Sequence, residues 1–162
     1  IPSAKINDKE LLEEVSKTKK QLVISTGMST LEEVDEAVNT ILKHNVNPII
    51  MHTNSAYPSP INELNLSLIP FYMERYKCII GYSGHEANLE PTIIAVSLGA
   101  RIIERHVTID KNLWGSDQKS SLSIHGMDIL LKRIKDYQEA LGEPVKKIFP
   151  SEIKAREKLR KN

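Results

Sequence analysis

Hydrophobic and polar residues follow one another along this chain of 162 residues in two recurring patterns. Short apolar runs, which are typical of buried strands, alternate with longer segments whose apolar residues recur every three or four positions, as on one helix face. We expect strands at residues 21–25, 48–52, 78–80 and 101–103, after a strand tip at 1–3. We expect helices after residue 8 and over residues 29–44, 61–76, 89–98, 124–141 and 151–161.

Uninterrupted alternation of strands and helices predicts an α/β protein with a parallel sheet, either a barrel or a doubly wound sheet. A complete (β/α)8 barrel takes about 250 residues. Four strands and a strand tip therefore amount to a little over half of such a barrel.

Local residues indicate where several helices begin or break. Thr30 and Glu33 have the spacing of a capping box, and Ser151 is the expected cap of the last helix. Pro70 lies inside the segment 61–76, where we expect it to kink the helix or split it in two, because proline lacks a backbone N–H.

The composition argues against several classes of function. Basic and acidic residues nearly balance, 22 against 21, so no nucleic-acid-binding or membrane-surface patch is indicated. No apolar run approaches the ~20 residues of a membrane span, and we recognise no signal peptide, Walker loop or dinucleotide-binding motif. Cys78 lies in an apolar run and is expected to be a core thiol. These features suit a cytoplasmic protein.

The most informative stretch, residues 77–117, contains two strands that are expected to be neighbours. His85 and His106 each follow one of them by a few residues. Because neighbouring strands lie about 5 Å apart, both imidazoles can reach one ion. Two histidines with carboxylate and water oxygens suit a divalent metal such as Mn²⁺, Zn²⁺ or Fe²⁺. The alternative is two unrelated histidines at loop entrances.

Other polar residues are expected on the same rim. Ser3, Ser25 and Ser83 end successive strands, and hydroxyls beside free backbone amides predict a phosphate pocket. Glu104 ends a strand and Asp117 lies in a following loop, and each could contact substrate or metal. Glu104 could equally be a partnered rim carboxylate, and Asp117 could be a turn former.

Five segments together resemble the N-acetylneuraminate (sialic acid) synthase family, which includes legionaminate-type nonulosonic acid synthases. They are VISTGMSTLEEV at 23–34, HTNSAYPSP at 52–60, GYSGHE at 81–86, SLGARIIERHVTID at 97–110 and WGSDQKSSL at 114–122. The resemblance covers essentially the whole chain. It implies a (β/α)8 TIM barrel of which residues 1–162 form only the C-terminal half, with about four parallel strands and their helices.

The resemblance also implies a reaction and the residues that carry it. Such enzymes condense phosphoenolpyruvate with an N-acetylmannosamine-like aldose, an N-acyl amino sugar, and release phosphate by C–O cleavage with the help of Mn²⁺ or Mg²⁺. His85 and His106 match the metal ligands, and Glu104 and Asp117 complete the expected catalytic set. The expected substrate-binding positions are Ser3, Ser25, Asn54, Ser55, Tyr57 and Ser83, with Asn54 and Ser55 as alternatives.

The sequence also differs from the family pattern. Gly84 stands where many members carry Asp, Arg105 replaces a common Lys, and Lys119 lies in a loop that is usually uncharged. The first half of the barrel, which brings a glutamate and lysines to the phosphoenolpyruvate site, has no counterpart in the chain, and neither does the antifreeze-like C-terminal domain. We therefore expect the isolated chain to be inactive and the full-length enzyme to be a homodimer.

Three other functions fit parts of this pattern. A synthase acting on an aldose phosphate would need a second, basic phosphate pocket, and no Arg/Lys cluster is expected at these strand ends. A metal hydrolase with two histidine ligands would work without phosphoenolpyruvate and would place more ligands on the rim. A half barrel could also bind metal or ligand without turnover.

Overall fold

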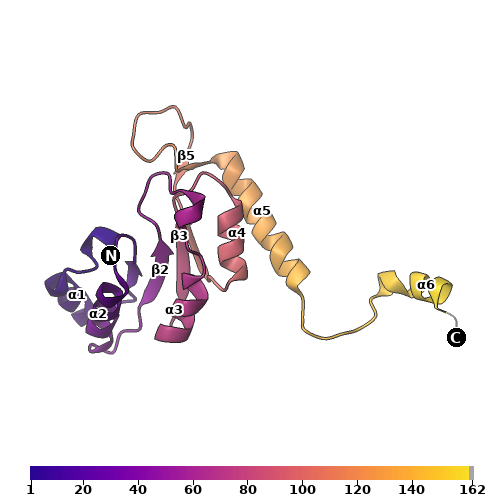
Figure 1. Cartoon of the computed structure of the whole chain (residues 1–162), viewed down its shortest axis with the longest axis horizontal. Coiled ribbons are helices and arrows are strands. Elements are labelled where there is room, and N and C mark those ends of the chain that lie inside the picture. Colours follow the sequence, from indigo (N-terminus) through magenta and orange to yellow (C-terminus); the bar gives the residue numbers. More distant parts are fainter. Residues whose placement is uncertain (161–162) are drawn as a thin grey trace.

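The computed structural model describes residues 1–160, in which helices cover a parallel sheet (Figure 1). The strands, which pair in sequence order, are β1 (Val23–Ser25), β2 (Ile49–Thr53), β3 (Ile80–Gly84) and β4 (Ile102–Arg105). The helices are α1 (Lys9–Lys17), α2 (Leu31–Leu42), α3 (Leu68–Tyr76), α4 (Glu90–Ser97), α5 (Ile124–Leu141) and α6 (Pro150–Leu159), with 3-10 helices η1 (Ser3–Lys5) and η2 (Ile61–Glu63). The predicted α/β alternation with a parallel sheet is confirmed.

A second, two-stranded sheet was not predicted. It consists of β5 (Val107–Thr108) paired in parallel with β6 (Leu122–Ser123). Strands of two residues are too short to show a hydrophobic period, so the sequence pattern indicated only a loop before α5.

The two faces of the main sheet differ because successive side chains of a strand point to opposite faces. Ile24, Ile50 and Tyr82 are at most 1% exposed and belong to the hydrophobic core. Their strand neighbours Ser25 and Ser83 line a pocket instead. One face of the sheet therefore carries the core, and the opposite face carries the polar side chains of the pocket together with apolar residues such as Val23 and Met51.

Strands β3 and β4 extend further than the sequence predicted. The residues expected at their polar tips belong to the strands themselves, because Ser83 pairs in register with Glu104 and Gly84 with Arg105. Backbone hydrogen bonds between strands do not depend on apolar side chains, so hydrophobicity alone underestimates strand length.

The start of α2 confirms the predicted capping box. The Thr30 hydroxyl accepts a hydrogen bond from the Glu33 amide at 3.3 Å, and Glu33 Oε2 accepts one from the Thr30 amide at 2.8 Å. The segment 61–76 is split in two as expected, but the break lies before α3 and not at Pro70. Pro70 lies in the first turn of α3, where a backbone N–H needs no partner within the helix. The break that separates η2 from α3 includes Asn65, whose φ is 44°.

The C-terminal segment also differs from expectation. Helix α6 begins at Pro150 with Phe149 as its N-cap, so Ser151 is not the cap; the expected helix end at Lys161 lies outside the described residues. Figure 1 shows α6 at the end of an extended segment, away from the sheet. Helix α5, by contrast, packs against α4, where Arg133 Nη1 lies 2.8 Å from Glu90 Oε1. Within residues 1–160, no helix has the length and apolar character required to cross a bilayer.

Two buried polar side chains lie near the core. Cys78 is partly buried against it, as predicted, and burial raises the pKa of its thiol. His52 is 4% exposed, and its Nε2 lies 2.7 Å from the Leu64 carbonyl oxygen. Because a carbonyl only accepts, Nε2 carries the proton, and burial lowers the pKa of His52 below 6.5.

The capping box yields a first prediction. Thr30→Ala should lower the free energy of unfolding by about 1 kcal/mol, because the Glu33 amide loses its acceptor. Urea denaturation of the chain measures the change. Asn39→Ala, an exposed substitution within the same helix, is the control and should not destabilise the chain. Equal stability of Thr30→Ala and the parent would contradict the role of the cap.

The buried imidazole yields a second prediction. Since the pKa of His52 is lower in the folded state, the unfolded chain takes up this proton first as the pH falls. The contribution of His52 to stability should therefore be complete above about pH 6.5 and decrease below it, toward the folded-state pKa. We expect His52→Gln to weaken the pH dependence of the free energy of unfolding between about pH 7.5 and about pH 5.5. His125→Gln, at an exposed histidine, controls for loss of an imidazole; an unchanged slope for His52→Gln would refute the prediction.

Candidate functional site

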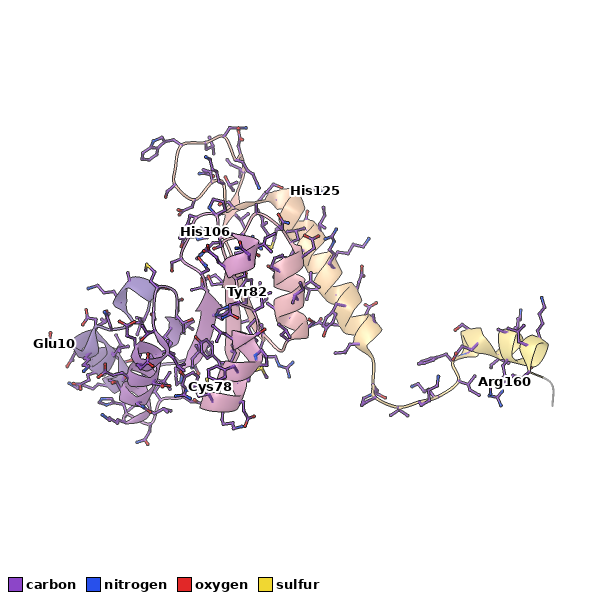
Figure 2. The ribbon with its side chains drawn as sticks, viewed as in Figure 1. Glu10, Cys78, Tyr82, His106, His125 and Arg160 are labelled. Carbon is purple, nitrogen blue, oxygen red and sulfur yellow. The ribbon has the colours of Figure 1, made fainter. Side chains whose placement is uncertain are left out.

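Strands β3 and β4 bring four predicted residues together on the polar face of the sheet. The Ser83 hydroxyl donates a hydrogen bond to Glu104 Oε1 at 2.7 Å, as the in-register pairing of these residues allows. Two positions further along, the imidazole ring centres of His85 and His106 lie 5.2 Å apart. Figure 2 shows that His106 lies closer than Tyr82 to the end of the sheet where Figure 1 labels β5.

The loop after β2 holds the neutral His85 ring in one tautomer. Its Nδ1 lies 2.6 Å from the Asn54 carbonyl oxygen, which can only accept, so Nδ1 carries the proton and Nε2 keeps a free lone pair. Burial lowers the pKa of His85, which favours the neutral ring; the hydrogen bond to Asn54 opposes this shift. Tyr57 stacks on the ring with a centroid distance of 4.1 Å. His85 is thus a neutral imidazole with a defined tautomer.

Aromatic and acidic side chains surround His106. The Tyr57 ring meets it edge-on at 5.6 Å, and Asp117 Oδ2 lies 3.8 Å from His106 Nδ1. The pKa of Tyr57 is raised, mainly by burial and then by the Asp117 and Glu104 carboxylates, so its phenol stays protonated. Tyr57 therefore can donate a hydrogen bond to a ligand in the pocket.

These residues line a pocket of about 510 Å³, a volume typical of small-molecule sites. The lining residues are Ile1, Pro2, Ser3, Ala4, Val23, Ser25, Met28, Thr53, Ser55, Tyr57, Ser83, His85, Glu104 and His106. Ser3 lies at the β1 end, where its Oγ accepts a hydrogen bond from the Gly27 amide at 3.0 Å. The hydroxyls of Ser3 and Ser25 thus lie toward the β1 end of the pocket, and the imidazoles and Glu104 lie toward β4 with the hydroxyls of Ser83 and Thr53.

Of the remaining predicted residues, Ser55 lines the pocket, whereas Asn54 and Asp117 lie beside it. The Asn54 side chain is used inside its own loop, where it accepts from the Ala56 amide at 2.8 Å, whereas Ser55 lines the pocket. Of these two alternatives, Ser55 has the better position to meet a ligand. Asp117 is not a lining residue and reaches the site only through His106.

Sequence reasoning missed two further features. Thr53 lines the pocket at the end of β2, 3.5 Å from His85 Nδ1, and its place at a strand end could have identified it. Glu86 and Arg105 form a buried ion pair at 2.8 Å behind the histidines. They are separated by 19 positions, so no local pattern indicates that they meet.

Within the described part of the chain, His85 and His106 are the candidates to hold an ion. Within residues 1–160, no group of three or more His, Cys, Asp or Glu side chains is arranged to hold a metal. His85 and His106 fit a site completed by water or substrate oxygens, because the Asn54 carbonyl fixes His85 with Nε2 free, as outer-shell partners of metal ligands do.

A parallel sheet with imidazoles, carboxylates and hydroxyls at the carboxyl ends of its strands defines an α/β protein with an enzyme-type ligand site. The chain belongs to the NeuB family, which matches residues 1–146. The resemblance inferred from the sequence motifs is therefore confirmed.

Named relatives are identical to the chain at about a third of the aligned positions. The N,N'-diacetyllegionaminic acid synthase of Campylobacter jejuni is 37% identical over 157 residues, which cover 95% of this chain and 47% of that protein. The N-acetylneuraminate-9-phosphate synthase of Homo sapiens is 34% identical over 163 residues, which cover 100% and 45%. The chain thus spans about half the length of the curated relatives it matches.

A solved structure agrees with these relatives. It is the N-acetylneuraminic acid (sialic acid) synthetase of Leptospira borgpetersenii in complex with citrate, which is 31% identical with a TM-score of 0.85. The match covers 100% of this chain and 58% of that one. The arrangement of strands and helices is therefore shared along the whole chain.

Proposed function

We propose that this chain is the C-terminal half of a (β/α)8 barrel in a nonulosonic acid synthase. The enzyme would condense phosphoenolpyruvate with an N-acetylmannosamine-like aldose and release phosphate. The observation that carries the proposal is the convergence of His85, His106, Tyr57 and the Ser83–Glu104 pair on one pocket in a member of the NeuB family.

The sheet supports the barrel. Each strand from β1 to β4 pairs with the next in sequence, which is how a (β/α)8 barrel is wound. Ile1 pairs with β1 as a further strand would, since its carbonyl accepts a hydrogen bond from the Ser25 amide at 3.1 Å. Within residues 1–160, β4 pairs only with β3, so its outer edge is open to another strand.

His85 and His106 would hold a divalent ion, Mn²⁺ or Mg²⁺, through ring nitrogens on the pocket side. When bound, such an ion polarises the sugar aldehyde and lowers the pKa of a coordinated water. Tyr57 would donate a hydrogen bond to the sugar, and Glu104 would accept from its hydroxyl groups. Asp117 would orient His106 from the rim.

The serines would hold the phosphate at the opposite end of the pocket. The Ser83 hydroxyl donates its hydrogen bond to Glu104, whose negative charge disfavours a phosphate nearby. Ser25, together with Ser3 and Ser55, lines the part of the pocket near β1, where a phosphate would avoid that charge. We therefore place phosphoenolpyruvate toward β1 and the sugar toward the histidines.

In this arrangement the enol carbon of phosphoenolpyruvate attacks the sugar aldehyde, and water adds to the resulting cationic carbon. Loss of phosphate then breaks the C–O bond of the tetrahedral intermediate. The serine hydroxyls bind the phosphate and do not form covalent bonds to it. The full-length enzyme would be a cytoplasmic homodimer, and the isolated 162-residue chain would be inactive.

The proposal predicts metal-dependent phosphate release by the protein expressed in full from its gene. With Mn²⁺ and N-acetylmannosamine, His85→Ala and His106→Ala should each lower phosphate release from phosphoenolpyruvate by about 100-fold or more, as should chelation of the metal. His125→Ala, at an exposed histidine of α5, is the control. A heavy-oxygen label at the bridging oxygen of phosphoenolpyruvate should appear in phosphate. Full activity of both histidine variants would refute the proposal.

The serine placement predicts a separate effect. Ser25→Ala should raise KM for phosphoenolpyruvate by about 10-fold or more with a smaller change in kcat, because a hydrogen bond to a charged group contributes roughly 1.5–3 kcal/mol. Ser29→Ala is the control, since its hydroxyl donates to the Gly27 carbonyl at 3.2 Å and does not line this pocket. An increase in the sugar KM alone would place the phosphate elsewhere.

A further inference from the structure

A buried ion pair lies directly behind the two imidazoles. Arg105 Nη1 is 2.8 Å from Glu86 Oε1, and the two side chains are 0% and 1% exposed. In every other ion pair found in residues 1–160, both side chains are at least 28% exposed. The Glu86–Arg105 pair is therefore shielded from solvent, whereas the other pairs are not.

Strand geometry connects this pair to the histidines. Glu86 follows His85 and Arg105 precedes His106 in the sequence. Because alternate residues point to opposite faces, His106 faces the pocket and Arg105 faces the helix-covered side. The same two strand ends thus carry the imidazoles on one face and the charged pair on the other.

The guanidinium of Arg105 fixes the loop that follows His85. It donates hydrogen bonds to the backbone carbonyls of Glu86 and of Asn88, the latter at 3.1 Å, and to Thr92 Oγ1 at 2.8 Å. The Tyr82 hydroxyl donates to Glu86 Oε2 at 2.8 Å. A side chain from β4 therefore determines the backbone path between β3 and α4.

Gly84 provides the space for this contact. A Cβ atom at Gly84 would lie 2.8 Å from Glu86 Oε2 and 2.8 Å from Tyr82 Cε1. A side chain at this position would require the Glu86 carboxylate or the Tyr82 ring to shift. The position of Glu86 thus depends on the end of β3 itself.

Stability alone does not account for the pair. A buried ion pair is often no more stabilising than apolar residues of the same volume, and Arg105 Nε has no hydrogen-bond partner within the described residues. What the pair does fix is geometry, because its bonds cross from β4 to the loop that carries His85.

We propose that Glu86 and Arg105 are positioning residues that hold the His85 and His106 imidazoles at the separation needed to bind one metal ion. The inference rests on the proposed function, since it assigns the pair to the metal site of that function. Neither residue touches the ion or the substrates. Both act through the backbone of the two strand ends.

The test compares three variants of the full-length protein with a control at the start of α4, the helix whose Thr92 Arg105 contacts. Arg105→Lys keeps the charge but loses the fork of donors, Glu86→Gln keeps the shape but loses the charge, and Tyr82→Phe removes only one hydrogen bond. The control is Glu90→Gln, which breaks the exposed pair with Arg133. Mn²⁺ affinity is measured by electron paramagnetic resonance of free Mn²⁺, together with kcat, KM for phosphoenolpyruvate and the unfolding temperature.

We expect Arg105→Lys and Glu86→Gln to weaken Mn²⁺ binding and to lower kcat by about 10-fold or more, with less than about a twofold change in KM for phosphoenolpyruvate. Tyr82→Phe should weaken Mn²⁺ binding about threefold. A lower unfolding temperature with parental Mn²⁺ affinity and kcat would overturn the proposal. If Arg105→Lys and Glu86→Gln do not fold, Tyr82→Phe decides: parental Mn²⁺ affinity and kcat in this variant would overturn the proposal.

A second readout requires no metal. Imidazole nitrogen shifts in the nuclear magnetic resonance spectrum of the metal-free protein report the tautomer of His85. The parent should carry its proton on Nδ1, bound to the Asn54 carbonyl, and Arg105→Lys should populate the Nε2–H form. An unchanged tautomer would count against the positioning of His85. If the parent neither binds Mn²⁺ nor releases phosphate, the proposed function fails, and this readout alone decides the inference.

Discussion

The in-register pairing of β3 with β4 is the constraint on which the rest of the site depends. Ser83 lies opposite Glu104, and Gly84 lies opposite Arg105. Because successive side chains of a strand alternate between the two faces, this register decides which face each side chain at the ends of β3 and β4 reaches. A slip of one residue would turn His106 toward the helices and Arg105 into the pocket. The imidazole pair, the Ser83–Glu104 hydrogen bond and the buried ion pair would all be lost together.

The same pairing divides the charges between the two faces of the sheet. On the helix side, Glu86 is neutralised by Arg105, and removing either partner would leave a buried charge that costs roughly 3–5 kcal/mol. On the pocket side, Glu104 receives only a hydroxyl donor, and Asp117 is half exposed. The negative charge that a metal ion would experience is therefore that of Glu104 and Asp117, with no net contribution from behind the sheet.

The features that the sequence predicted and those that it missed differ mainly in how far apart the residues involved lie along the chain. Local patterns predicted the alternation of strands and helices, the Thr30–Glu33 capping box and the start of α5, because each depends on residues a few positions apart. The gathering of His85 and His106 followed from strand order. Pro70 was misjudged because its effect depends on where α3 begins, and that is set by the turn near Asn65. The choice between Asn54 and Ser55, like the Glu86–Arg105 contact, depends on side-chain directions that only the folded backbone defines.

The electrostatics of the pocket decide how an anionic substrate would be held there. Phosphoenolpyruvate carries a phosphate and a carboxylate, and anions of this kind are bound by Arg, Lys, metal ions or helix N-termini. No Lys or Arg is among the pocket-lining residues that residues 1–160 provide, and Glu104 adds a negative charge. Hydroxyl groups can orient such a ligand but cannot offset its charge. On the proposed function, the balancing charge must come from a metal ion at the histidines and from cationic residues outside this chain. On the same proposal, a further strand would pair with the outer edge of β4, which within residues 1–160 pairs only with β3.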